Sequence, residues 1–136
     1  MVRAIVRVLA LATVASCGSA TATSTLPPAQ ILVTVTPQGG SSSTTVGFPP
    51  ALPRGSSVLV ITARDAQGVP VVIAPARYRF DLTPAAGGNY AASAINNLAW
   101  TITTSSAGAA SLTYQLFDMQ TSSVVVGPVT LSVTLL

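Results

Sequence analysis

From residue 31 onward, apolar side chains recur at every second position in short runs that turn residues interrupt. The clearest run is 77–82, in which apolar and charged residues alternate: Tyr78, Phe80 and Leu82 against Arg77, Arg79 and Asp81. Such alternation is typical of a strand with one face buried and the other in water. No stretch keeps helical spacing over three turns. The chain is therefore expected to be all-β.

Seven segments carry this pattern or a short apolar run bounded by turn residues. They are 31–36, 57–64, 71–73, 77–82, 98–103, 110–116 and 129–135. Between two of them, Asp65 and Gly68 are suited to a tight turn, because Asp can bond nearby backbone and Gly tolerates positive φ. About seven short antiparallel strands predict an immunoglobulin-like β-sandwich over residues 31–136.

The charged residues exclude most kinds of chemistry. The chain has no Lys, Glu or His; it has six arginines and three aspartates, Asp65, Asp81 and Asp118. Without His or Lys, neither a Ser-His nor a Ser-Lys pair can activate a nucleophile. Three scattered carboxylates are a poor supply of ligands for zinc or calcium. We therefore expect no enzyme, no catalytic residue, no metal and no cofactor.

The high isoelectric point does not indicate a nucleic-acid-binding protein. Arg3 and Arg7 lie in the first seven residues, ahead of the short apolar run 8–15. A charged start followed by a short hydrophobic stretch is typical of a secretory signal. Removal of that signal leaves four cations against three anions, with no basic patch to bind nucleic acid.

The single cysteine lies directly after this run, in Val14-Ala15-Ser16-Cys17. This tetrapeptide resembles the bacterial lipobox, in which an aliphatic and two small residues precede a cysteine. The resemblance implies lipidation of Cys17, a signal peptide at 1–16, and palmitate or similar acyl chains as a membrane anchor. The alternative is ordinary secretion with cleavage after Ala22.

Residues 17–30 are rich in Ser, Thr, Ala and Pro and have no periodic apolar face. They are expected to form a flexible tether. Gly18 and Ser19 follow the cysteine, where an Asp would resemble an inner-membrane retention signal. The favoured location is therefore the outer membrane of the bacterial cell envelope.

Two turns resemble a known family. Residues 62–71 (TARDAQGVPV) and 103–112 (TTSSAGAASL) are similar to turns in bacterial immunoglobulin-like domains of the invasin/intimin type. The second turn has Ser105 and Ser106 where the family often has an Asp. The resemblance implies a rigid module for spacing, adhesion or assembly, and brings no catalytic residues.

Two features are candidates for partner contact. One is the outward row with Arg77 and Arg79, whose guanidinium groups are suited to binding carboxylates or glycans. The alternative interpretation of this row is a solvated strand face that resists edge pairing. The second is the proline-rich loop in which Phe48 and Leu52 are expected to be exposed. The alternative interpretation is a loop that only caps the end of the sandwich.

These features favour a membrane-anchored, non-catalytic lipoprotein that binds an envelope protein or glycan, or has a structural role. The alternative is a self-assembling fibre or surface-layer subunit. In that case the first strand, or the last at 129–136, would pair with a neighbouring subunit by strand addition.

Overall fold

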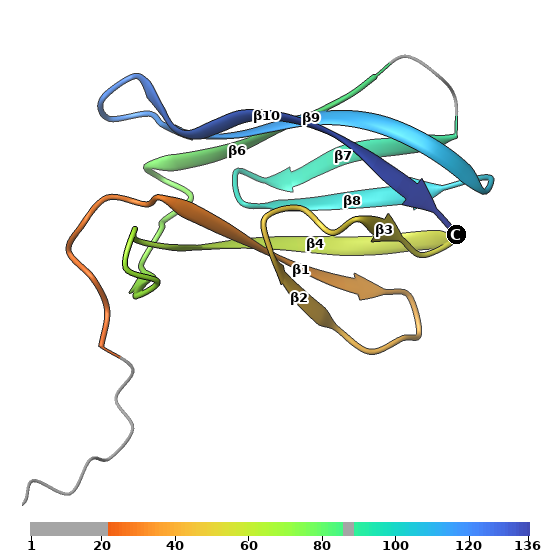
Figure 1. Ribbon diagram of the computed structural model, residues 1–136, viewed down its shortest axis with the longest axis horizontal. Coiled ribbons are helices and arrows are strands. Elements are labelled where there is room, and N and C mark those ends of the chain that lie inside the picture. Colours follow the sequence, from red (N-terminus) through yellow and green to blue (C-terminus); the bar gives the residue numbers. More distant parts are fainter. Residues whose placement is uncertain (1–21, 86–88) are drawn as a thin grey trace, which may run out of the picture.

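In the computed structural model, which describes residues 22–85 and 89–136, two β-sheets lie face to face (Figure 1). The described residues contain no helix. The prediction of an all-β sandwich is confirmed.

The first sheet has six strands. Five follow the order β2-β1-β4-β8-β7, and β5 pairs with the far end of β4. Their bounds are β1 Gln30–Pro37, β2 Ser43–Val46, β4 Gly55–Arg64, β5 Pro70–Val71, β7 Tyr90–Asn96 and β8 Ala99–Thr104. All the pairings are antiparallel.

The second sheet has four strands in the order β3-β10-β9-β6. Their bounds are β3 Ala51–Leu52, β6 Tyr78–Pro84, β9 Gly108–Asp118 and β10 Ser123–Leu135. The β3–β10 pair is parallel and the others are antiparallel. The β9–β10 register shifts on both sides of Val126, next to Gly127.

Seven of the ten strands have the order of an immunoglobulin domain. In a constant-type domain, strands A, B, E and D form one sheet and C, F and G the other. Here β1, β4, β8 and β7 take the first set of places, and β6, β9 and β10 the second. The remaining strands β2, β3 and β5 are short additions.

The sequence did not predict β2, β3 or β7. β2 lies in the polar stretch 38–46, and β3 lies in the proline-rich stretch 47–53 that was expected to be a loop or an irregular edge crossing. β7 lies in a stretch of mostly small residues. Each pairs with a strand that was predicted, namely β1, β10 and β8 respectively. Pairing with a neighbouring strand therefore decides their conformation.

The core lies between the sheets and uses the expected faces. Tyr78, Phe80 and Leu82 of β6 are buried, as are Leu112, Tyr114 and Leu116 of β9. They pack against the alternate residues Leu59 and Ile61 of β4 and Ile31, Val33 and Val35 of β1. Each fully buried side chain of this size contributes about 1.5–3 kcal/mol by removal from water.

The first and last strands differ in how far their neighbours cover them. β1 lies between β2 and β4 and pairs with β4 along all eight of its residues. β10 lies between β3 and β9. β1 is paired on both sides over residues 33–35. β3 covers only Thr134 and Leu135 of β10, so the outer side of β10 over residues 123–133 has no partner strand in the part of the chain that the structure describes.

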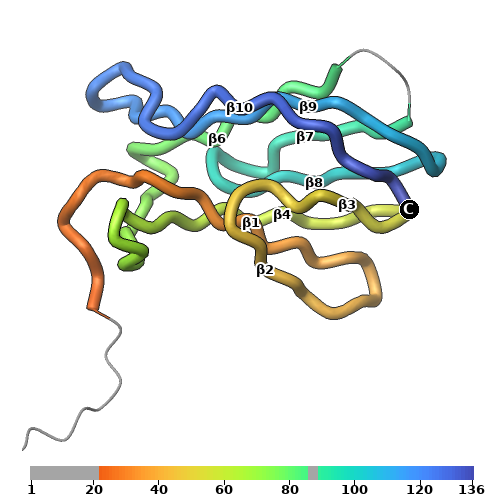
Figure 2. The backbone as a smooth tube through the Cα atoms, viewed as in Figure 1, coloured from red at the N-terminus to blue at the C-terminus, as the bar shows by residue number. Residues whose placement is uncertain are grey.

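Part of the segment expected to be a tether lies against the domain (Figure 2). The Ser24 amide donates a 2.7 Å hydrogen bond to the Pro70 carbonyl, and the Ala29 amide donates a 2.9 Å hydrogen bond to the Arg64 carbonyl. Pro28 between them is buried. The chain from Ser24 to Ala29 therefore follows the end of the sandwich formed by β5 and the β4–β5 turn.

Candidate functional site

Arg79 and Asp81 lie on the outer face of β6, and Arg77 lies in the turn just before this strand. The charges of this row are paired. The Arg79 Nε atom lies 2.6 Å from Asp81 Oδ1, and Gln115 Nε2 donates to Asp81 Oδ2 at 3.0 Å. Partial burial alone would raise the pKa of Asp81, yet these hydrogen bonds leave that pKa lowered. The Arg79 guanidinium also lies over the Phe117 ring, 5.0 Å from its centroid. This face is therefore close to electrically neutral.

The second arginine of the row pairs with Asp118 at the end of β9. Arg77 Nη2 lies 2.7 Å from Asp118 Oδ2, and its Nε lies 3.1 Å from the same oxygen. The Arg77 side chain is 46% exposed, whereas that of Asp118 is 4% exposed. The hydrogen bonds from Arg77, helped by the amides of Gln120 and Thr121, lower the pKa of Asp118 to about 2.

Asp65 forms the turn that its sequence predicted. Its Oδ1 accepts 2.9 Å hydrogen bonds from the amides of Gln67 and Val69, and Gly68 has a φ of 82°. A hydrogen bond from the Ser24 side chain is the largest cause of the lowered pKa of Asp65. The turn therefore binds the N-terminal segment as well as its own backbone.

The prediction that Phe48 and Leu52 are exposed is wrong. Both were expected to be exposed on a proline-rich loop, but Phe48 is 7% exposed and Leu52 is 0% exposed. The Phe48 ring stacks on Tyr114 with centroids 6.0 Å apart, and Leu52 lies on β3 beside β10. The loop crosses from the first sheet to the second, so its apolar side chains enter the core and offer no surface to a partner.

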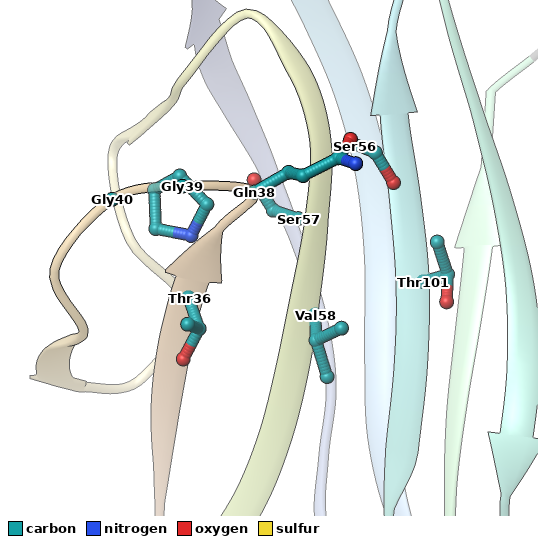
Figure 3. Close-up of a pocket in the computed structure, with 9 residues that line it drawn as sticks. Thr36, Gln38, Gly39, Gly40, Ser56, Ser57, Val58 and Thr101 are labelled. Carbon is teal, nitrogen blue, oxygen red and sulfur yellow. The ribbon is translucent and has the colours of Figure 1, made fainter.

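A shallow hollow of about 460 Å³ lies on the outer face of the first sheet, beside the β1–β2 turn. Figure 3 shows Thr36, Val58 and Thr101 on three neighbouring strands, with the Gln38 side chain extending toward Ser56. Hydroxyl, amide and aliphatic groups form its lining, without a titratable side chain. Such a lining suits a neutral polar group and offers no acid or base.

The sequence pattern did not predict β7 or its exposed edge. This strand ends the first sheet beside β8, and its outer side has no neighbouring strand among the described residues. Its inward residues Tyr90 and Ala92 pack on the core, but the pattern is weak because the other side chains, apart from the exposed Ile95, are small or polar. The gap between the predicted strands at 77–82 and 98–103 is the signal that could have indicated it.

Cys17 lies outside the described residues. Within them, no helix has the length and apolar character needed to cross a bilayer. The described part of the chain also brings no three side chains of the types His, Cys, Asp and Glu together. Comparisons with protein-family models, with curated proteins and with solved structures found no match.

Proposed function

We propose that this chain is a membrane-anchored, non-catalytic lipoprotein of the bacterial cell envelope, with a sandwich domain that serves as a structural, adhesion or protein-binding module. One observation supports the proposal that the domain is not catalytic. All three carboxylates of the chain have structural partners: Asp65 in its turn, Asp81 with Arg79 and Asp118 with Arg77.

A general base must be free to accept a proton from a reacting group. Asp118 is nearly buried and bound to a cation, and Asp65 accepts two backbone amides. Their lowered pKa values make both carboxylates weaker bases than an ordinary Asp. These contacts favour a binding or structural role over hydrolysis.

The anchor is proposed from Val14-Ala15-Ser16-Cys17, which resembles a lipobox. Lipidation of Cys17 would place the domain on the envelope membrane, with the outer membrane favoured. Because five residues span at most about 18 Å, Ala22 would stay within that distance of the lipidated residue. The end of the sandwich at β5 would then face the bilayer, since Ser24 is bonded to Pro70 there.

The module itself is proposed to be of the invasin/intimin type. Support comes from the turn at Asp65 and Gly68, which resembles that family, and from the immunoglobulin strand order. Its partner would be an envelope protein or glycan. Arg77 and Arg79 remain the proposed contacts, because nearly half of each side chain is exposed despite its ion pair.

The test is the intact mass of the chain from the membrane fraction of a bacterial host, wild type beside Cys17→Ser. We expect a mature chain that begins at Cys17 and carries the added mass of acyl chains, and no such mass in the variant. An unmodified chain that begins near Thr23 in both the wild-type and the variant sample would contradict the proposed lipid anchor. A matched Ser16→Thr variant should keep some lipidated product, because the cysteine is retained.

A further inference from the structure

Strand edges differ sharply in how well they resist pairing with another chain. An exposed edge presents unpaired amides and carbonyls, and proteins protect it with charges, prolines or short strands. β3 and β5 have two residues each, and β2 has four. β6 carries Arg79 and Asp81 and ends at Pro84. Each of these edges is therefore protected by length, charge or proline. The outer side of β10 is covered by β3 only at Thr134 and Leu135, and Pro128 and register shifts on both sides of Val126 interrupt the rest of it.

β7 has none of these protections. It is seven residues long, Tyr90–Asn96, without a charged residue or a proline. Its ladder with β8 is regular from Tyr90 to Ala94 and is disturbed only between Ala94 and Asn96. Five consecutive residues therefore present an undisturbed edge.

The side chains of this edge allow close approach of a second strand. Ala91 and Ser93 alternate with the inward residues, are exposed and are small, and Ile95 is 56% exposed. Small side chains leave the backbone groups open, and an exposed Ile offers apolar surface for a cross-strand contact. The edge therefore has both the hydrogen-bonding groups and the apolar surface that strand addition requires.

We propose that the β7 edge pairs antiparallel with the β7 edge of a second copy of this chain. Two identical edges related by a two-fold axis are self-complementary, because each amide that meets a carbonyl is matched by its symmetry mate. Neither β7 nor the adjacent β8 carries a charge, so two copies meet without like-charge repulsion. A charged peptide would find no complementary group on these two strands.

The pairing would join two six-stranded sheets into one continuous sheet. It does not depend on lipidation of Cys17. Because a single strand edge buries less surface than a standard interface, we expect a dissociation constant in the range of about 1–100 μM.

The test is sedimentation of the full chain, purified in detergent, over a concentration series up to about ten times that range. The variants are Ser93→Lys and Ser93→Asp, with Thr83→Lys on the β6 edge as the matched control. Like charges close across the pair should raise the dimer dissociation constant at least about fivefold. Thr83→Lys should leave it unchanged, and an equimolar mixture of Ser93→Lys and Ser93→Asp should recover the wild-type value or better.

A wild-type chain that stays monomeric at the highest concentration would overturn the proposal. So would a dimer that Ser93→Lys leaves intact, or one that only Thr83→Lys weakens. Circular dichroism of each variant shows whether the domain is still folded. Recovery in the mixture gives a second check, because two misfolded variants would not restore association.

Discussion

The guanidinium of Arg77 binds the nearly buried carboxylate of Asp118 across the β6–β9 ladder, 41 residues apart in the chain. Tyr78 is the residue opposite Asp118 in that ladder, and the Met119 amide bonds the Arg77 carbonyl at 2.8 Å. Asp118 also accepts the Gln120 amide at 2.9 Å. One side chain thus joins the start of β6 to the β9–β10 turn.

This pair predicts a loss of stability in acid. The pKa of Asp118 falls from an ordinary 3.8 to about 2 on folding, so the ionised carboxylate favours the folded state. Its contribution is complete above about pH 4 and is lost as the pH falls toward 2. Urea unfolding between pH 5 and 2 should show this slope, and Asp118→Asn should flatten it.

Asp81→Asn is the control for that experiment. Asp81 also has a lowered pKa, but its side chain is 29% exposed and its ion pair is screened by water. We expect its removal to change the acid slope less than Asp118→Asn does. An equal change in the two variants would contradict the special role of the Arg77–Asp118 pair.

The burial of Phe48 predicts a stability defect on truncation. Phe48→Ala removes a 7% exposed ring that stacks on Tyr114, and should lower the free energy of unfolding by about 3–5 kcal/mol. Val46→Ala, at a neighbouring side chain that is 56% exposed, should change it by less than about 0.5 kcal/mol. Chemical denaturation of both variants checks this difference, and equal effects would contradict the buried position.

Gly127 predicts a second defect, for a reason of backbone geometry. Its φ is 90°, and a Cβ added there would lie 2.9 Å from the Tyr114 carbonyl oxygen. Gly127→Ala should therefore cost about 1–3 kcal/mol in the free energy of unfolding. Two causes contribute to this cost, the positive φ and the close contact with the Tyr114 carbonyl. Gly39→Ala separates them, because Gly39 has a φ of 75° but open space around it. Thermal unfolding should show the smaller effect at Gly39.

The contacts of the N-terminal segment predict a pattern of hydrogen exchange. The amides of Ser24 and Ala29 donate to backbone carbonyls of the domain, so they should exchange at least about tenfold more slowly than the amide of Thr25. Asp65→Ala removes an acceptor that the Ser24 side chain binds, and should speed exchange at Ser24. Uniformly fast exchange from residue 22 to 29 would show that the segment detaches.

Local patterns predicted those parts of the fold that local physics decides. The alternation in β6 gave its buried and exposed faces correctly, because each side chain's direction follows from its place in the strand. Asp65 was predicted to bond its own turn, and it does so through Gln67 and Val69. These features need no knowledge of distant residues.

The features that the sequence missed depend on distant partners. β7 is a strand because β8 pairs with it, and its Ala and Ser residues give little alternation of their own. Phe48 and Leu52 lie in a stretch with the composition of an exposed loop, yet the path between the two sheets places them in the core. No partner for Asp118 could be predicted from the sequence, because its contact with Arg77 becomes visible only with the β6–β9 register.

The described chain enters at one end of the sandwich and leaves at the other (Figure 1). β1 begins opposite Arg64 and ends opposite Ser57, and β10 runs toward the end where it pairs with Gly108. A pulling force applied between the two ends would therefore act along both strands and load their ladders in shear. The backbone bonds that join the eight residues of β1 to β4 must then yield together, so the sandwich is built to resist tension along its length.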